Sequence, residues 1–150
     1  MIAVIQRVKN AKVETENNII SKINCGLLIL LGISHYDNEE DIKWLGNKII
    51  NLRIFDDENG IMNKSCLEIN GDILTVSQFT LYSRTKKGNR PSYIDAASPE
   101  IAIPLYENFI KNLDFLLGKK TFSGEFGANM QVDLCNDGPV TIIIDTKNKK

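Results

Sequence analysis

The chain has 150 residues, of which 43% are hydrophobic and 25% are charged, a composition typical of one globular domain with its own core. Its formal net charge is −1, so the overall charge does not indicate nucleic-acid binding, and a partner carrying phosphates would have to be met by a local patch. No stretch reaches the roughly 18–20 apolar residues of a membrane span.

Cysteine and histidine usage narrows the chemistry further. The cysteines (Cys25, Cys66 and Cys135) form no CxxC pair, and their odd number argues against a disulfide framework. His35 is the one histidine, so a zinc site or a Ser-His-Asp triad would have to include it. The first residues lack the basic-then-apolar order of a signal peptide. We therefore expect a cytoplasmic protein that uses no metal, no cofactor and no membrane.

The first part of the chain is predicted to be mainly β-structure followed by a helix. β-Forming runs predict four strands, at 2–8, 11–16, 19–24 and 26–34. The pair Asn17-Asn18 marks a turn between the second and third, and the Gly-bounded, apolar fourth run is typical of a buried central strand. Acidic residues 38–41 then precede apolar side chains at helical spacing from Ile42 to Leu52, which predicts a helix there.

The second helix is expected within residues 98–117. Ser98 suits the N-cap position and Pro99 suits the first helical position. Pro104 lacks the N–H that a helix interior uses. The helix therefore either is irregular near its start or begins close to Pro104.

The remaining segments complete a β-rich pattern. Asn-Gly pairs at 59–60 and 70–71 predict hairpins. Further strands are expected at 72–78, 121–126, 129–134 and 140–145. Many strands, few helices and no strand–helix alternation predict an α+β, mostly β fold, with a β-barrel or sandwich-like core and two helices. We expect one domain over residues 1–145 and a flexible basic tail at 146–150.

Polar side chains gather in the stretch TVSQFTLYS, residues 75–83. Ser77, Gln78 and Thr80 place hydroxyl and amide groups near the end of a predicted strand, where a site could open. A strand with one polar face has the same pattern. Neither a GxSxG motif nor a second histidine is present to activate a serine.

The loop that follows is basic. Arg84, Lys86, Lys87 and Arg90 lie within seven residues, with no acidic residue among them. A solvated surface loop and a phosphate-binding patch both fit this composition.

Three motifs together indicate a family. SQFTL at 77–81, KKGNRPSY at 86–93 and NDGPVT at 136–141 resemble, in this order and spacing, the D-aminoacyl-tRNA deacylases. The start MIAVIQRVKNAKV and the strand GLLILLGI resemble the family as well, so the similarity covers essentially the whole chain. Read alone, the Asn-Asp-Gly-Pro of the third motif would be only a turn before a strand.

The resemblance implies a homodimer that hydrolyses the ester between a D-amino acid and the terminal adenosine of tRNA, with active sites at the subunit interface. A cis Gly138-Pro139 bond of one subunit would face the Ser77–Thr80 pocket of the other. Its carbonyls would accept hydrogen bonds from the substrate ammonium, and an L-side chain would clash with the segment. Glycine has no side chain to clash, so we expect glycyl-tRNA to be accepted too.

The same resemblance assigns the remaining roles. The catalytic stretch would comprise Ser77, Gln78, Phe79 and Thr80, and the backbone N–H groups of Phe79 and Thr80 suit an oxyanion. The ribose 2′-hydroxyl would assist. Three side chains besides Gln78 would hold the terminal adenosine: Ala102, Phe126 and Met130. Arg7 would brace the Gly-Pro segment, and the basic loop would contact tRNA phosphates through Arg84, Lys86, Lys87 and Arg90.

Two other classes of function remain open at this point. A small-ester hydrolase would use Thr80 or Ser77 as a covalent nucleophile, which requires an activating base. A non-catalytic RNA-binding β-module would explain the basic loop but not the Gly-Pro segment.

Overall fold

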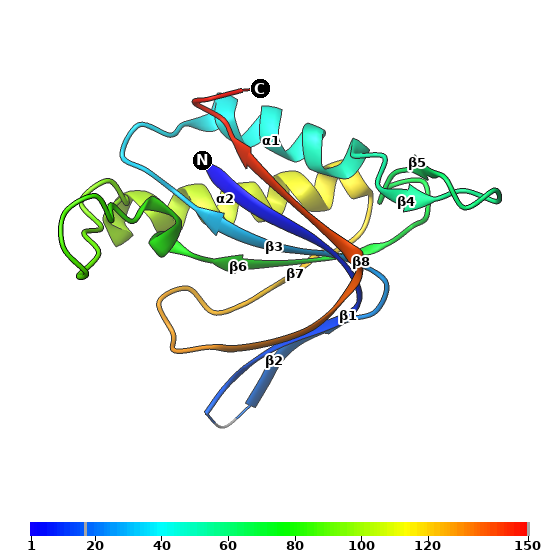
Figure 1. Ribbon diagram of the computed structural model, residues 1–150, viewed down its shortest axis with the longest axis horizontal. Coiled ribbons are helices and arrows are strands. Elements are labelled where there is room, and N and C mark those ends of the chain that lie inside the picture. The colour runs from blue at the N-terminus through cyan, green and yellow to red at the C-terminus, as the bar shows by residue number, and fades with distance from the viewer. Residues whose placement is uncertain (17, 150) are drawn as a thin grey trace.

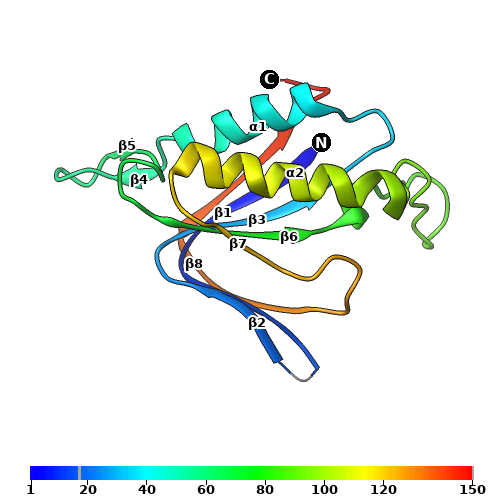
Figure 2. The same cartoon turned by 180° about the vertical axis from the view of Figure 1, so that it is seen from behind.

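A computed structural model describes residues 1–16 and 18–149, and these form a strongly curved sheet with two helices packed on one of its faces (Figure 1, Figure 2). The elements follow in the order β1 (Ile2–Thr15), β2 (Asn18–Ile23), β3 (Gly26–Gly32), α1 (Glu39–Asn51), β4 (Phe55–Asp56), β5 (Met62–Lys64), β6 (Asp72–Ser77), the 3-10 helix η1 (Phe79–Tyr82), α2 (Pro99–Leu117), β7 (Phe122–Ser123) and β8 (Gln131–Asp145). The predicted α+β, mostly β fold is confirmed. The turn expected at Asn17-Asn18 involves residue 17, which lies outside the described residues.

β1 is the strand around which the sheet curves. Its first half pairs with β3 and its second half with β2, and β8 pairs along its other edge for most of its length. The sequence predicted a break in each of these long strands. The structure instead keeps both strands continuous and shifts their register near residues 6 to 10 of β1, so the irregularity is a bulge.

Two parallel pairings were not evident from the sequence. β3 pairs with β6, and β6 with β7, both in parallel. The crossovers between them are α1 with the β4–β5 hairpin, and η1 with α2. The hairpin predicted at residues 59–60 is confirmed. The one predicted at 70–71 is wrong: the N–H of Gly71 donates to the carbonyl of Cys66, so this is a turn that leads into β6.

The core lies on both faces of β3, as its apolar sequence predicts. Leu27, Ile29 and Leu31 point to the cluster between the sheet and the helices. Leu28 points the other way, into a smaller cluster enclosed by the curved sheet. Both faces of β3 are therefore anchored, and its end, where the candidate site lies, is held in place.

Both helices begin as their sequences predict. Asn38 caps α1 in a reciprocal capping box with Asp41. α2 starts at Pro99 and continues through Pro104, so the early start is correct. In the described chain, neither helix combines the length with the apolar character needed to cross a membrane.

The segment that follows β8 makes contacts with α1. Thr146 is buried, and the ammonium group of Lys147 lies 2.7 Å from a carboxylate oxygen of Asp41 on α1. Lys149 lies over the ring of Trp44. The described part of the tail expected to be flexible, residues 146–149, thus contacts the first helix.

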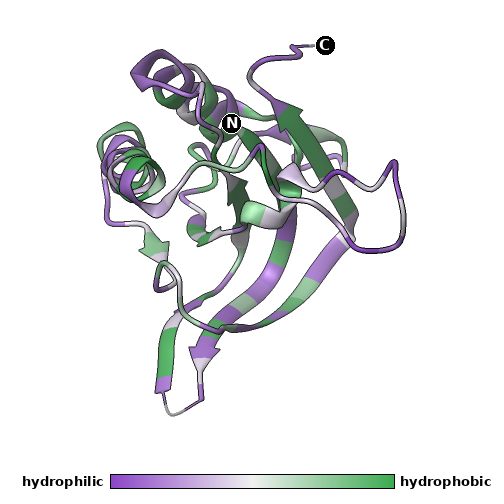
Figure 3. Ribbon diagram, turned by 90° about the vertical axis from the view of Figure 1, so that its left-hand side faces the viewer, coloured by the Kyte–Doolittle hydropathy of each residue, from purple (hydrophilic) through white to green (hydrophobic). Residues whose placement is uncertain are grey.

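β8 presents apolar side chains to solvent. Its last residues form the apolar arrow that ends beside the C-terminus in Figure 3. Ile143 in this segment is 70% exposed. Within the described residues, β8 pairs with β1 along one edge and with no other strand.

Candidate active site

A cavity of about 290 Å³ opens where β3 and β6 end. The start of α2 and the loop before β8 complete its walls. Its lining consists of Leu31, Ile33, Val76, Ser77, Gln78, Phe79, Ala97, Ala102, Phe126, Gly127, Ala128, Asn129, Met130 and Val132. Six of the residues predicted from the sequence are among them: Ser77, Gln78, Phe79, Ala102, Phe126 and Met130.

Ser77, Gln78 and Phe79 line this cavity, whereas Thr80, the next residue, is not part of the lining. The position of this stretch is set by the N–H of Gln78, which donates to the carbonyl of Leu31 at 2.8 Å, so the chain stays on the edge of β3 as it leaves β6. The Gln78 side-chain amide then donates to the Thr80 hydroxyl at 2.5 Å. Phe79 and Thr80 are the first two residues of η1. The backbone N–H groups at the start of a helix have no acceptor within that helix.

Aromatic and apolar side chains form the opposite wall. Phe126 packs edge-on against Tyr106, with ring centroids 5.5 Å apart. Tyr106 is buried and donates its hydroxyl to the carbonyl of Thr75. Burial raises the pKa of Tyr106, which keeps this donor protonated. Tyr106 does not line the cavity but supports Phe126, and it was not predicted because a single tyrosine at a helical core position carries no distinguishing pattern.

The cavity lining has no ionisable side chain. Every lining residue lies in the described part of the chain, and none of them is Asp, Glu, His, Lys, Arg, Cys or Tyr. Ser77 therefore has no side-chain base in the lining to remove its proton. The polar groups available to a substrate are hydroxyls, amides and the backbone.

Gly138 and Pro139 lie outside this cavity in the same chain. Their peptide bond is cis, as the resemblance implied, and both residues are exposed in the middle of β8. Arg7 lies behind them and is 7% exposed. Its guanidinium donates to the carbonyl of Asp137 at 2.8 Å and to that of Ile54 at 2.6 Å. Arg7 thus contacts the residue before Gly138 from the buried side of the segment, and the bracing role stays a prediction.

A family model described as D-Tyr-tRNA(Tyr) deacylase matches residues 4–145. The chain belongs to the D-Tyr-tRNA(Tyr) deacylase family. It is 63% identical to the D-aminoacyl-tRNA deacylase of Bacteroides fragilis (strain YCH46) and 62% identical to that of Flavobacterium psychrophilum, in both cases over 100% of each chain.

Two solved structures are similar to this chain over nearly its whole length. A structure titled "c-Myc DNA Unwinding Element Binding Protein" matches with a TM-score of 0.90 at 41% identity, over 97% of this chain and 98% of that one. A probable eukaryotic D-amino acid tRNA deacylase matches with a TM-score of 0.80 over 95% and 97% of the two chains. At 16% identity, the second match shows the fold alone.

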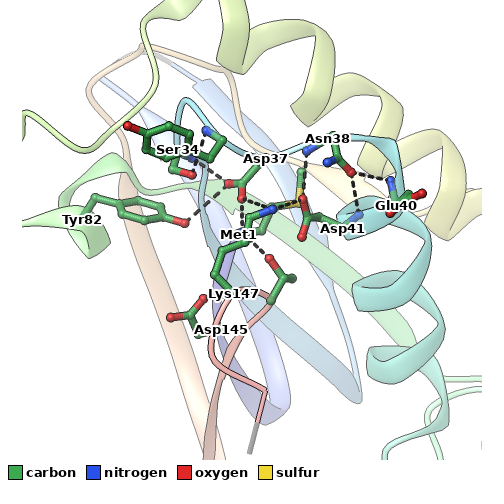
Figure 4. Close-up of polar contacts among 11 residues, drawn as sticks. Met1, Ser34, Asp37, Asn38, Glu40, Asp41, Tyr82, Asp145 and Lys147 are labelled. Atoms are coloured by element: carbon green, nitrogen blue, oxygen red, sulfur yellow. Dashed lines mark hydrogen bonds and ion pairs between the residues drawn. The ribbon is translucent and has the colours of Figure 1, made fainter.

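A polar cluster supports η1 in this deacylase-family chain (Figure 4). The buried carboxylate of Asp37 accepts from the α-amino group of Met1 at 2.5 Å and from the N–H of Ser34 at 2.7 Å. The hydroxyl of Tyr82, the last residue of η1, lies 3.5 Å from the same carboxylate. Burial, with the nearby Asp37 charge, raises the pKa of Tyr82, so its hydroxyl is a donor.

The basic residues of the loop at 84–90 differ in their contacts. Arg84 makes a bidentate pair with Asp95, at 2.5 and 2.6 Å, and its backbone bridges to Ser92. Its guanidinium therefore closes the loop. For Lys86, Lys87 and Arg90, all exposed, no ion pair occurs with the residues that the structure describes.

The cysteines and the histidine lie away from the cavity. Burial raises the pKa of the Cys66 thiol to about 12, so it is not a nucleophile at neutral pH. His35 is exposed and does not line the cavity. Across residues 1–16 and 18–149, no three His, Cys, Asp or Glu side chains gather as ligands of a metal ion would.

Proposed function

We propose that this member of the D-Tyr-tRNA(Tyr) deacylase family hydrolyses the ester between a D-amino acid and the terminal ribose of tRNA, in the cavity bounded by Ser77–Phe79 and Phe126. The products are free tRNA and the D-amino acid, and the reaction removes a product that synthetases do not fully exclude. The observation that carries the proposal is an uncharged cavity lined by Ser77, Gln78 and Phe79, at the start of η1. We place the reaction in the cytoplasm, where charged tRNA is used.

Catalysis is assigned to orientation and to backbone donors. An aminoacyl ester is already labile, so holding it against donors that stabilise the developing oxyanion is sufficient. The N–H groups of Phe79 and Thr80 supply these donors, and the Gln78–Thr80 hydrogen bond fixes their turn. With no base in the lining, the 2′-hydroxyl of the substrate ribose assists the attacking water. Loss of one such donor typically reduces the rate about 10²–10³-fold.

The apolar wall accepts the terminal adenosine. Phe126 offers a ring for stacking, and Met130 and Ala102 line the space beside it. Base stacking on an aromatic ring is worth about 1–3 kcal/mol. Lys86, Lys87 and Arg90 then contact tRNA phosphates, with a salt dependence that reflects a small number of contacts.

Chiral selection is assigned to Gly138 and Pro139 of a second subunit. In one chain these residues are exposed and outside the cavity, which fits a segment that acts on a partner. The exposed apolar end of β8, including Ile143, is surface of the kind that a dimer buries. The carbonyls of the segment accept from the substrate ammonium and its bulk excludes an L-side chain, so D-aminoacyl and glycyl esters are hydrolysed and L-esters survive.

The test compares D-tyrosyl-tRNA, L-tyrosyl-tRNA and glycyl-tRNA at one enzyme concentration. We expect rapid loss of the D- and glycyl esters and survival of the L-ester. The Ser77→Ala variant should retain activity within a few-fold, since no activated serine is involved. A Ser77→Ala variant that is inactive and a wild type that forms an acyl-enzyme would favour the small-ester hydrolase. Decay of all esters at the buffer rate, with tRNA still bound, would favour the RNA-binding module.

A further inference from the structure

The Gly138-Pro139 segment is the tip of a bulge. Gln6 pairs with Thr141 and Val8 pairs with Asn136, so between these pairs β1 contributes only residue 7 while β8 contributes residues 137–140. Four residues thus oppose one. Such a bulge is left unpaired by the ladder, so its shape has to be maintained by other contacts.

The side chain of Asn136 closes the base of this bulge. Its Oδ1 accepts from the N–H of Val140 at 2.8 Å, and its Nδ2 donates to the carbonyl of the same residue at 3.1 Å. Nδ2 also lies 3.0 Å from the Oε1 of Gln6 and 3.2 Å from the hydroxyl of Thr141. The Asn136 side chain therefore connects the two ends of the bulge, residues 136 and 140, to each other and to Gln6 of β1.

The N–H and the carbonyl of Val140 determine which side chain at position 136 can bind both. A backbone N–H only donates and a backbone carbonyl only accepts, so the clamp needs an acceptor and a donor on one short side chain. Aspartate would supply the acceptor and lose the donor, and alanine would lose both. Asparagine supplies both at this length.

The other side of the bulge is already filled. Arg7 donates to the carbonyl of Asp137, and a Cβ added at Gly138 would lie 2.8 Å from a methyl carbon of Val140 and 3.1 Å from the Arg7 guanidinium. The tip therefore rests on Arg7 and Val140. Val140 itself is held by its two backbone hydrogen bonds with Asn136.

We propose that Asn136 is a positioning residue for chiral selection: by clamping Val140, it aims the exposed Gly138-Pro139 carbonyls at the substrate ammonium. This inference rests on the proposed role of that segment. Asn136 touches neither the cavity nor the substrate and acts through Val140. Its loss should therefore change the discrimination between D- and L-esters more than it changes the capacity for hydrolysis.

The test measures the ratio of D-tyrosyl- to L-tyrosyl-tRNA hydrolysis for wild type, Asn136→Asp and Asn136→Ala. We expect the ratio to fall about 10–100-fold in Asn136→Ala, since a misplacement of about 1 Å costs that much. Asn136→Asp, which keeps the acceptor for Val140, should fall less. Two controls separate aiming from general loss of stability: Ile49→Val, a buried core change on α1, and Asn47→Ala, which removes an exposed amide contact on the same helix.

Amide exchange of Val140, followed by NMR, provides a second readout independent of activity. It should accelerate in Asn136→Ala and stay unchanged in Ile49→Val. A wild-type D/L ratio in Asn136→Ala, or an equal loss in Ile49→Val, would overturn the positioning role and leave the proposed function intact. Equal hydrolysis of both esters by the wild type would overturn the proposed function, and the chiral role of Asn136 with it.

Discussion

The cavity and the Gly138-Pro139 segment are constructed in opposite ways. The cavity is concave and uncharged, and its walls are backbone, amide and apolar groups. The segment is convex and exposed, and charged groups hold it from behind, with Asp137 lying 3.7 Å from Arg7 and 4.0 Å from Lys9. A cavity that orients a labile ester requires walls that fit the substrate. A segment that projects from a strand requires contacts that keep it in place. If both act on one substrate, one supplies the reaction and the other the selection.

The largest effect is expected when the cavity is altered in one subunit and the Gly138-Pro139 segment in the other. Ala102→Phe fills the cavity. Gly138→Ala adds a Cβ to the crowded segment and so displaces the carbonyls proposed to hold the substrate ammonium. Each variant alone should lose about 100-fold in D-tyrosyl-tRNA hydrolysis. Heterodimers made by co-expression and purified with two tags contain one intact cavity facing one intact segment. These purified heterodimers should recover about half of wild-type D-tyrosyl-tRNA hydrolysis, because one of their two sites is intact.

Unfolding midpoints and circular dichroism of each variant serve as the control for folding. If purified heterodimers were as inactive as both parents, the segment would not act on a partner's cavity.

A moderate effect is expected from the cavity wall alone. Phe126→Ala removes the proposed stacking surface, so KM for D-tyrosyl-tRNA should rise about 5–150-fold, the equivalent of 1–3 kcal/mol of stacking. Tyr106→Phe is the matched control: it keeps the edge contact with Phe126 and removes the hydrogen bond to Thr75. It should cost about 1 kcal/mol of stability and leave KM nearly unchanged. Equal KM values in both variants would show that Phe126 only packs.

The smallest effect concerns a contact outside both regions. Burial alone would raise the pKa of Asp41, but hydrogen bonds from Lys147 and Thr146 outweigh it and the pKa lies below its ordinary value. A carboxylate with a depressed folded pKa stabilises the fold above its unfolded pKa, about 3.9, and loses this as pH falls through the folded value. Hydrogen bonding to Asp41 raises the pKa of Lys147 above its ordinary value of 10.5. The stabilisation that charged Lys147 contributes is therefore fully present below pH 10.5.

Lys147→Met should therefore lower the unfolding midpoint by about 1–3 °C between pH 5 and 9, because the pair is partly exposed. The difference from wild type should vanish near about pH 2, where Asp41 is protonated in both proteins. Calorimetry across this range is the measurement, with Lys43→Met as the control for loss of one positive charge. A difference that persisted in acid would mean that the lysine stabilises by packing.

Much of the fold followed from local patterns in the sequence. The buried strand at 26–34 and the helix after Asn38 were predicted because apolar spacing and capping residues act over a few positions. The two parallel crossovers were missed because a hairpin and a long loop interrupt the usual strand–helix alternation. The continuity of β1 and β8 was missed for a similar reason: a bulge and a turn use the same residues, and only the partner strand distinguishes them.

The candidate site divides in the same manner. Residues inside a motif, such as Ser77 to Thr80 and Gly138-Pro139, could be proposed from the sequence because motif residues are contiguous. Met130 and Phe126 were proposed only through the resemblance, since a single apolar side chain in a loop carries no pattern. The pairing of Arg84 with Asp95 was not predicted, because an ion pair across eleven residues depends on how the loop closes. Asn136 was visible within NDGPVT, but its clamp on Val140 required the structure.

The pairing of β1 with β8 also determines when activity can arise. Ile2 lies opposite Asp145, so the sheet is closed by its earliest and latest strands. Contacts at such sequence separation make folding slow, on the order of milliseconds to seconds. A chain synthesised only as far as β7 lacks Met130 and Val132 of the cavity wall and the whole Gly138-Pro139 segment. The cavity wall and the Gly138-Pro139 segment can therefore be completed only after β8 has been synthesised.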